Sequence, residues 1–245
     1  MNDRSEAIAP AFGDPATPAG LSAPGIPAYL QKIYWWAYLH PKAVRVFERE
    51  WLVNLILWGN FRRLRDAALD EFGERIEQHV LQIACVYGDF TQRIAARLHG
   101  KGRLDVVDVA PIQLANLRRK LGTNSPVGLH RQDSSALDFP TASVDASLLF
   151  FLLHEQPEAV RRATLAAALR VTRPGGKVVI VDYHRPRRRH PLRLPMHAVL
   201  RTLAPFALDL WRHEIADYLP PGLDRGAIAK RTAFGGLYQT LVIQL

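Results

Sequence analysis

From residue 73 onward, short apolar runs alternate with longer segments in which apolar residues recur at helical spacing. This alternation is typical of a parallel sheet whose strands are joined by crossover helices. The predicted strands cover residues 79–85, 104–109, 127–131, 144–153 and 177–181. The predicted helices cover residues 89–99, 111–120 and 157–171. We therefore expect one α/β domain over residues 73–245, with helices on both faces of its sheet.

The pattern changes on either side of this alternation. Residues 29–72 show helical spacing broken near Pro41, and form a predicted helical cap that holds four of the five tryptophans. Residues 185–219 are a basic and apolar insertion, expected to be helical in its later part, and residues 228–245 predict a hairpin around Gly235 and Gly236. Residues 1–28 are rich in alanine and proline, lack the apolar centre of a signal peptide, and predict a disordered tail.

The balance of charges indicates which classes of partner the chain can bind. The 32 Lys and Arg residues against 23 Asp and Glu residues give a net charge of +9, which predicts affinity for an anionic surface or ligand. The single cysteine, Cys85, excludes an intrachain disulfide and a zinc site built from cysteines, so we expect a reducing compartment. No apolar run reaches the roughly 18 residues that span a bilayer.

The loop after the first predicted strand has the position and length of the cofactor loop of class I methyltransferases, at the sheet edge where ligands bind. Such loops normally carry an acidic residue and three alternate glycines. Here Gln82 stands at the acidic position, Ala84 and Val86 replace two glycines, and Gly88 remains. Gly88 is equally compatible with close packing of a helix on the strand, and Cys85 is better suited to packing than to nucleophilic chemistry.

Three further signals follow in order along the chain. Asp108 ends the second strand, where a carboxylate can accept hydrogen bonds from ribose hydroxyls, although it could instead cap the next helix. Asp133 and Ser134 follow the third strand, where an adenine amino group is commonly held, although they could form a local turn. A turn at residues 173–177 precedes the fifth strand. Together the four signals predict a class I, Rossmann-type fold that binds S-adenosylmethionine (SAM).

Polar residues suited to chemistry follow the fourth and fifth strands. His154 and Glu155 come after the fourth strand, and Asp182 and His184 after the fifth. Imidazole and carboxylate groups at converging strand ends could act as an acid–base pair or bind a divalent metal. A structural role for each is an equal alternative, and no motif assigns metal ligands.

Four segments together resemble one family. Residues 35–41, 56–60, 81–89 and 108–113, which read WWAYLHP, ILWGN, LQIACVYGD and DVAPIQ, are similar to the rhodoquinone-biosynthesis proteins, relatives of the ubiquinone/menaquinone C-methyltransferases. The resemblance extends from about residue 29 to the C-terminus. It implies that SAM donates its amino group to ubiquinone in place of a ring methoxy group, with manganese supporting the reaction.

The resemblance also implies roles for individual residues. Asp108 and Asp133 match the acidic residues of the second and third cofactor motifs, and the altered first motif contains Val86 and Tyr87. The expected cofactor-binding residues are Ala84, Val86, Tyr87, Gly88, Asp108, Asp133 and Ser134. We hypothesise that side chains in place of glycines turn the methionine part of SAM, so that its α-amine faces the quinone. Because an ammonium cannot attack a ring carbon, a base is needed. The candidates are His154, Glu155, Asp182 and His184.

A quinone with a polyprenyl tail stays in the bilayer, so the enzyme must meet it at a membrane surface. Aromatic and basic residues suited to such a surface lie in the predicted cap: Trp35, Trp36, Trp51, Trp58, Tyr34, Tyr38, Arg62, Arg63 and Arg65. A second basic run precedes the apolar stretch 194–211 and contains Arg185, Arg187, Arg188, Arg189 and Arg193. We expect a lipid-facing substrate mouth on an anionic membrane, at the cytoplasmic face of a bacterial inner membrane. Packing of the tryptophans against the sheet is the alternative.

Two other functions fit the same residues. One is a SAM-dependent quinone C- or O-methyltransferase, and the other is a non-catalytic, membrane-associated SAM-binding protein. Nucleic-acid modification is disfavoured, because the basic residues lie beside apolar segments and no Asn-Pro-Pro-Tyr-type motif follows the fourth strand. None of these patterns specifies the tail length of the quinone or the oligomeric state.

Overall fold

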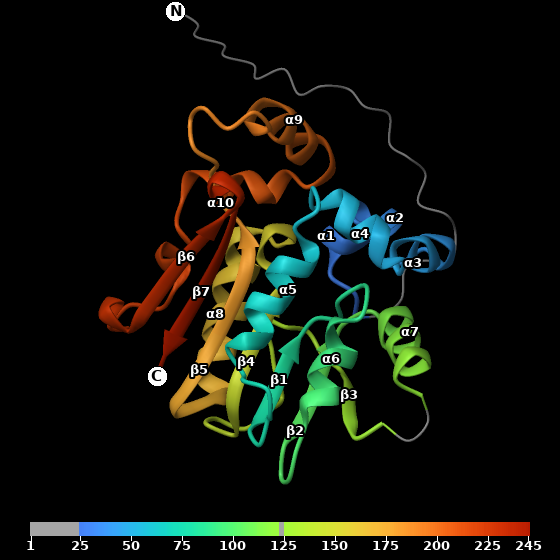
Figure 1. Ribbon diagram of the computed structural model, residues 1–245, viewed down its shortest axis with the longest axis vertical. Coiled ribbons are helices and arrows are strands. Elements are labelled where there is room, and N and C mark those ends of the chain that lie inside the picture. Colours follow the sequence, from blue (N-terminus) through green and yellow to red (C-terminus); the bar gives the residue numbers. More distant parts are fainter. Residues whose placement is uncertain (1–24, 123–124) are drawn as a thin grey trace, which may run out of the picture.

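The computed structural model describes residues 25–122 and 125–245, so most of the predicted tail lies outside the described residues. Within the described part, seven strands form one mixed sheet in the order β3-β2-β1-β4-β5-β7-β6 (Figure 1). The strands are β1 (His79–Ile83), β2 (Arg103–Asp108), β3 (Val127–Arg131), β4 (Val144–Phe150), β5 (Thr172–Tyr183), β6 (Ile228–Ala233) and β7 (Tyr238–Gln244). β7 pairs antiparallel with both β5 and β6, which confirms the C-terminal hairpin, and the other pairs are parallel.

Helices cover both faces of the sheet, as predicted (Figure 1). One face packs against α5 (Phe61–Asp70), α6 (Phe90–Arg97) and α7 (Pro111–Leu121), and the other against α8 (Glu158–Val171). Successive residues of β5 belong to opposite cores, Val179 to the first and Val178 and Ile180 to the second, and all three are fully buried. Because both faces are covered, residues 178–181 of β5 form a continuous apolar run.

Two strand boundaries differ from the prediction by three residues or more. β4 ends at Phe150, because Phe151 has a φ of +53° and the chain turns into a short 3-10 helix, η1 (Leu153–Glu155). β5 begins at Thr172, and the predicted turn at 173–176 lies inside it, where the register against β4 shifts. The earlier end of β4 places η1 at the carboxyl edge of the sheet.

The N-terminal helices and the insertion lie beyond the carboxyl ends of the parallel strands (Figure 1). The N-terminal helices are α1 (Ala28–Lys32), α2 (Trp35–Tyr38), α3 (Pro41–Phe47) and α4 (Glu50–Ile56). The predicted break near Pro41 is confirmed, since Pro41 opens α3, where its missing N–H is not needed. The insertion contains α9 (Arg193–Leu203) and α10 (Asp209–Arg212). Among the helices of the described residues, none has the length and apolar character to cross a membrane.

Candidate active site

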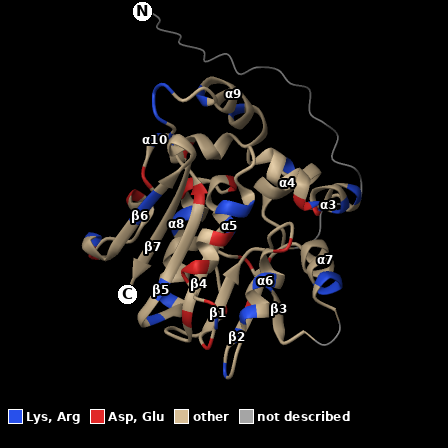
Figure 2. Cartoon of the chain, viewed as in Figure 1, with Lys and Arg blue, Asp and Glu red and all other residues tan. Residues whose placement is uncertain are grey.

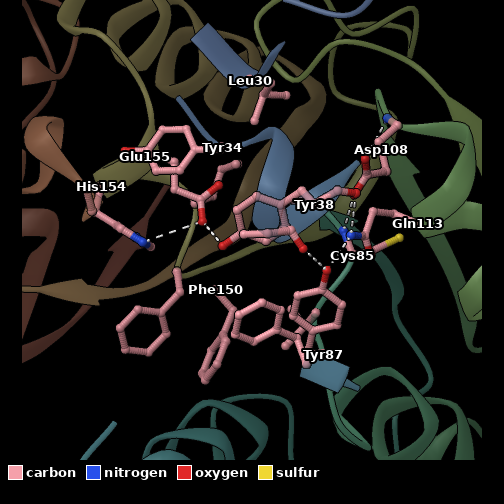
Figure 3. A pocket seen from close by; sticks show the side chains of 18 of the residues that line it. Leu30, Tyr34, Tyr38, Cys85, Tyr87, Asp108, Gln113, Phe150, His154 and Glu155 are labelled. Atoms are coloured by element: carbon pink, nitrogen blue, oxygen red, sulfur yellow. Dashed lines mark hydrogen bonds and ion pairs between the residues drawn. The ribbon is translucent and has the colours of Figure 1, made fainter. Parts of the chain in front are cut away.

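A cavity of about 270 Å³ lies at the carboxyl ends of the parallel strands, between the sheet and the N-terminal helices (Figure 3). Its sheet side is formed by the loops after β1, β2, β3 and β4, and its other side by α1, α2, α4 and α9. Six of the predicted cofactor residues line it: Ala84, Val86, Tyr87, Asp108, Asp133 and Ser134. The predicted catalytic residues His154 and Glu155 line it too. The fold therefore brings six of the seven predicted cofactor residues and two of the four predicted catalytic residues into one space.

The loop after β1 keeps the backbone of a glycine loop although an alanine replaces one glycine. Ala84 has a φ of +78°, in the left-handed region that disfavours side chains. Gln82 supports it: the Gln82 amide donates to the Ala84 carbonyl at 2.9 Å, and its carbonyl accepts from the Thr91 hydroxyl at 2.9 Å. Gln82 is fully buried. The residue at the usual acidic position is thus an internal support, whereas Ala84 lines the cavity.

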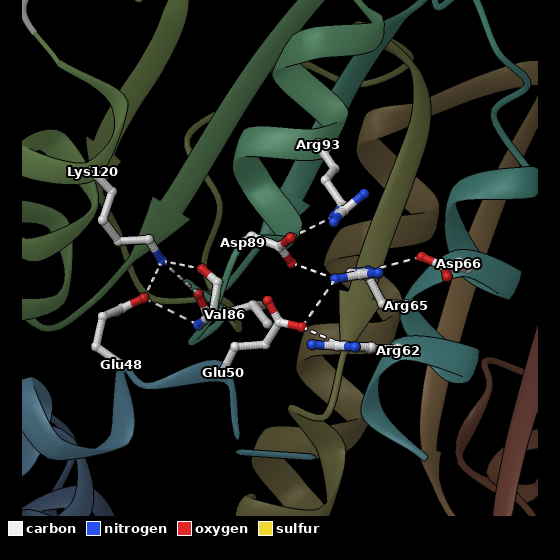
Figure 4. A network of polar contacts seen from close by, with 10 residues as sticks. Glu48, Glu50, Arg62, Arg65, Asp66, Val86, Asp89, Arg93 and Lys120 are labelled. Carbon is white, nitrogen blue, oxygen red and sulfur yellow. Dashed lines mark hydrogen bonds and ion pairs between the residues drawn. The ribbon is translucent and has the colours of Figure 1, made fainter. Parts of the chain in front are cut away.

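Gly88, unlike the other predicted cofactor residues, packs beside the cavity rather than lining it. A Cβ at this position would lie 3.1 Å from the Phe61 ring. The Gly88 N–H donates to the Glu48 carboxylate at 3.0 Å. The same carboxylate pairs with Lys120 at 2.6 Å (Figure 4) and accepts a hydrogen bond from Asn116. Glu48 therefore ties the N-terminal helices to the loop after β1, and Gly88 has the packing role that its sequence position left open.

Arg65 belongs to a neighbouring ion-pair network rather than to a lipid-facing surface. It is only 3% exposed and pairs with Asp89 at 2.6 Å and with Asp66 at 2.8 Å (Figure 4). Arg62 pairs with Glu50 at 2.7 Å but stays exposed. The expected contact of Arg65 with lipid headgroups is wrong, because burial and two carboxylates hold its guanidinium inside the protein.

Asp108 ends β2 at the cavity wall. Its carboxylate accepts the N–H groups of Cys85 and Ala110, each at 2.8 Å. Burial raises the pKa of Asp108, although these backbone hydrogen bonds oppose the rise. A carboxylate has about four acceptor positions, so ribose hydroxyls can still bind beside the contact with Ala110. Burial and the Asp108 charge raise the pKa of the Cys85 thiol, which disfavours it as a nucleophile.

Asp133 and Ser134 line the cavity and are held by nearby residues. The Asp133 carboxylate accepts hydrogen bonds from the Ser135 N–H at 2.8 Å and from the Ser135 hydroxyl at 2.7 Å. These bonds form the local turn that was the alternative interpretation of this segment. The Ser134 hydroxyl lies 3.0 Å from that of Thr164 and accepts from the Gln156 amide at 2.9 Å. These contacts hold both residues at the cavity wall, and their contact with a cofactor stays a prediction.

A chain of polar groups begins with Tyr38 of α2, Glu155 and His154 in the cavity (Figure 3) and continues to Asp182 of β5 behind it. The Tyr38 hydroxyl donates to the Glu155 carboxylate, whose Oε1 lies 3.5 Å from His154 Nε2. His154 Nδ1 lies 3.0 Å from Asp182 Oδ1, an ion-pair contact without hydrogen-bond alignment. Burial raises the pKa of Glu155 to about 7, against the opposing effects of His154 and Tyr38. Burial is the largest single effect on the pKa of His154 and lowers it, but Asp182 and Glu155 together outweigh burial and raise that pKa. Glu155 can therefore exchange a proton near neutral pH.

The other two predicted catalytic residues do not line this cavity. Asp182 is fully buried behind His154. Its carboxylate accepts three backbone N–H groups, those of Leu153, His154 and Tyr183. This position suits Asp182 to orienting the imidazole. His184 faces a second cavity, where its Nε2 lies 3.5 Å from Glu214.

The described residues do not form a manganese site. Among them, no group of three or more His, Cys, Asp or Glu side chains is placed to hold a metal ion. His154, Glu155 and Asp182 lie in a row, but backbone N–H groups occupy the Asp182 carboxylate and Tyr38 occupies that of Glu155. Manganese therefore follows only from the sequence resemblance.

Tyr34 and Tyr38 lie inside the cavity, not at the membrane interface that was predicted (Figure 3). Tyr38 stacks on Tyr87, with ring centroids 5.9 Å apart and an interplanar angle of 7°. The Gln113 amide donates to the Tyr87 hydroxyl at 2.7 Å. The buried Tyr34 hydroxyl has no hydrogen-bond partner among the described residues. Tyr34 and Tyr38 are four residues apart, so a helix places them on one face. This spacing is the signal in the sequence that could have assigned both tyrosines to one site.

Comparison with known proteins identifies the fold. A family model described as a methyltransferase domain matches residues 80–176. The crystal structure of a SAM-dependent methyltransferase from Aquifex aeolicus aligns with a TM-score of 0.52 at 16% identity, covering 83% of this chain and 97% of that one. The chain has the class I SAM methyltransferase fold. Human N-acetylserotonin methyltransferase, solved in complex with SAM, aligns with a TM-score of 0.57 at 13% identity, covering 90% of this chain and 63% of that one. The predicted fold class is confirmed.

Sequence relatives include two enzymes named for quinones. The ubiquinone/menaquinone biosynthesis C-methyltransferase of Shewanella piezotolerans is 27% identical over 137 residues, which are 55% of this chain and 54% of that protein. The 2-phytyl-1,4-naphtoquinone methyltransferase of a Nostoc species is 25% identical over 175 residues, which are 70% of this chain and 76% of that protein. The chain thus spans about half the length of the first of these relatives.

Proposed function

We propose that this protein is a SAM-dependent transferase that modifies the ring of a quinone with a lipid tail. The observation that carries the proposal is the make-up of the cavity. Asp108, at the edge where the fold binds cofactors, and Glu155, with its raised pKa, line the same space. The rim of that space is apolar and includes Ile56, Val199 and Leu203. One cavity thus combines a cofactor side, a proton acceptor and an apolar entrance.

The residues at the ends of β1, β2 and β3 fit SAM. Asp108 would accept the ribose hydroxyls, and Asp133 with Ser134 would face the adenine. The Tyr34 hydroxyl is buried in the same cavity, has no hydrogen-bond partner in the described part of the chain, and can donate to a polar group of the ligand. Bound SAM supplies the methyl or amino group that is transferred.

An apolar ring and tail fit the remainder of the cavity. Phe150 and Phe151 line it near Glu155. The rim residues Val199 and Leu203 of α9 are 43% and 46% exposed. Large apolar side chains exposed at a cavity mouth favour a hydrocarbon ligand. The two relatives above are named for quinone substrates, which supports a quinone over other lipids.

Glu155 would act as the base. A carboxyl with a pKa of about 7 is about half ionised at neutral pH, so it can take the proton that the reacting group loses. The Tyr38 hydroxyl stabilises the carboxylate by its hydrogen bond. His154, held by Asp182, lies on the other side of Glu155 at 3.5 Å and can share the proton. The aromatic side chains of the N-terminal helices keep water from this pair.

Transfer of the methyl group is the first candidate reaction. Both relatives are methyltransferases by name, and the first is a C-methyltransferase. A ring atom would form a bond to the methyl carbon as the sulfur–carbon bond breaks, and Glu155 would take the proton that the ring loses.

Transfer of the amino group is the second candidate, and the loop after β1 favours it. Ala84 holds a methyl group where a glycine would leave space, and Val86 adds a branched side chain to the same wall. These side chains would turn the methionine part of the cofactor so that its α-amine faces the quinone, which is compatible with the amino transfer that the resemblance to the rhodoquinone-biosynthesis proteins implies. The α-nitrogen would bond to the ring carbon, Glu155 would take the ammonium proton, and the methoxy group would leave with its bonding electrons and a proton as methanol. The bond between the nitrogen and the α-carbon must then break: loss of the α-proton would pass two electrons to the quinone ring, and water would hydrolyse the resulting imine to an aminoquinol and the 2-oxo acid of the cofactor.

One incubation separates these reactions. Purified protein is mixed with SAM labelled with heavy nitrogen at the α-amine and with a short-tailed ubiquinone, its quinol, or a short-tailed quinol that has an unsubstituted ring position, with and without manganese, and the mass of the product is measured. A gain of one CH₂ identifies methyl transfer, and replacement of one methoxy group by labelled NH₂ identifies amino transfer. The variant Ala84→Gly/Val86→Gly should lower amino transfer if the loop directs the amine. Unmodified quinone in every reaction, despite bound SAM, would refute the proposed activity.

A further inference from the structure

A second cavity, of about 550 Å³, lies between the start of the insertion, α10 and β6. Five arginines line it: Arg185, Arg187, Arg188, Arg193 and Arg212. Within residues 25–122 and 125–245, only Arg212 of the five has a carboxylate within ion-pair distance, Asp209 at 3.6 Å. The acidic lining residue Glu214 is already paired with Lys230. The described carboxylates therefore leave most of the positive charge of this cavity unpaired. Figure 2 shows blue Lys and Arg positions along the segment that precedes α9.

Helix α9 connects this arginine cavity to the substrate cavity. Its first residue, Arg193, lines the arginine cavity, whereas Val199 and Leu203 line the substrate cavity. Among the described residues, no side chain caps the N-terminus of α9, so the N–H groups of its first turn add to the positive potential. Leu194, next to Arg193, is 80% exposed. With 11 residues α9 is roughly 16 Å long, which suits a helix that lies along a membrane surface.

Helix α4 extends the exposed apolar surface of α9. Trp51 and Leu55 of α4 are 60% and 64% exposed. Trp58, which follows α4, is 44% exposed, and its indole N–H donates to the Met196 sulfur of α9 at 3.0 Å. The two helices lie at the same end of the molecule (Figure 1). Tryptophan and leucine side chains exposed in this way are costly in water and suit the boundary between water and lipid.

We propose that the arginine cavity binds the phosphate group of an anionic phospholipid and so seats α4 and α9 in the membrane interface. Guanidinium groups bind phosphate through paired, charge-assisted hydrogen bonds. A free phosphate or a nucleic acid would satisfy the arginines but would leave Leu194, Trp51 and Leu55 in water, whereas a phospholipid accounts for both. Because Val199 and Leu203 rim the substrate cavity, that cavity would open toward the bilayer.

Vesicle flotation of the full chain tests this docking without any use of the proposed reaction. Vesicles of phosphatidylcholine are compared with vesicles that also contain phosphatidylglycerol. The variant Arg187→Glu/Arg188→Glu should lower binding to the anionic vesicles about tenfold or more. The matched control, Arg75→Glu/Lys101→Glu, makes the same change of net charge at exposed sites before β1 and β2 and should change binding about twofold or less. Equal losses for the two variants would overturn the proposal.

Further measurements distinguish a phospholipid from other ligands of the arginine cavity. Leu194→Ser should weaken flotation on anionic vesicles, since it removes an inserted side chain. If the wild-type chain binds inorganic phosphate or single-stranded RNA through Arg187 and Arg188 but floats equally with both kinds of vesicle, the occupant is not a phospholipid and the proposal fails. Turnover of a short-tailed, water-soluble quinone should be unchanged in Arg187→Glu/Arg188→Glu. A failed docking surface is therefore distinguishable from a failed activity.

Discussion

Replacing Glu155 by glutamine should make the stability of this fold less sensitive to pH. Glu155 is 6% exposed, and glutamine keeps its size and its acceptor oxygen for Tyr38 while removing the charge. Burial raises the pKa of the Glu155 carboxyl from an ordinary 4.5 to about 7. Between these values the unfolded chain is ionised at this position and the folded chain is not. The free energy of unfolding therefore falls as pH rises through this window.

The size of the effect follows from the gap between the two pKa values. At about 1.4 kcal/mol per pH unit, the wild-type chain should lose about 3 kcal/mol of stability through Glu155 between about pH 5 and pH 8. The glutamine variant cannot lose this contribution. It should therefore be more stable than the wild type by about 3 kcal/mol near pH 8, and this advantage should vanish near pH 5.

Urea unfolding followed by tryptophan fluorescence at a series of pH values measures this difference. Glu158→Gln is the matched control, because Glu158 lies on α8 with its side chain 58% exposed and paired with Arg162. Its profile should follow that of the wild type within about 0.5 kcal/mol. If the profile of Glu155→Gln also runs parallel to the wild type, Glu155 does not titrate near neutral pH in the folded chain. That result would refute both the stability argument and the role of Glu155 as the base.

The other predictions concern the cofactor loop and the contacts of Glu155. Tyr38→Phe should move the acidic limb of the rate–pH profile to higher pH, because the Tyr38 hydroxyl lowers the pKa of Glu155; an unmoved limb would exclude this contact. Asp108→Asn should weaken SAM binding about 10- to 100-fold in calorimetry, since hydrogen bonds to a charged group contribute about 1.5–3 kcal/mol, and unchanged affinity would place the ribose elsewhere. Ala84→Gly should raise the melting temperature by about 2–4 °C, because a side chain at a φ of +78° costs about 1 kcal/mol. Ala110→Gly, at a φ of −90°, should lower it, and a change of the same sign in both variants would contradict the strain argument.

Local signals were sufficient for most strands and for the residues at their ends. Strands buried on both faces are rich in apolar residues, so they stand out in the sequence. Asp108, Asp133 and Glu155 could be assigned to one cavity because a parallel sheet gathers its strand ends at one edge. The end of β4 was misplaced, because the apolar run continues past Phe150 while the backbone turns at Phe151. The apolar pattern of the sequence does not reveal that turn, because the residues on both sides of it are apolar.

The sequence by itself determined the sheet, its helices and the altered loop around Ala84, since these depend on local periodicity and on the order of segments along the chain. Only the tertiary structure decided that Tyr38 meets Glu155 across 117 positions of sequence, and that Arg65 turns inward. These contacts depend on where the N-terminal helices dock against the sheet. Packing and ion pairs such as that of Glu48 with Lys120 set this docking, and such long-range pairs leave no periodic trace in either segment.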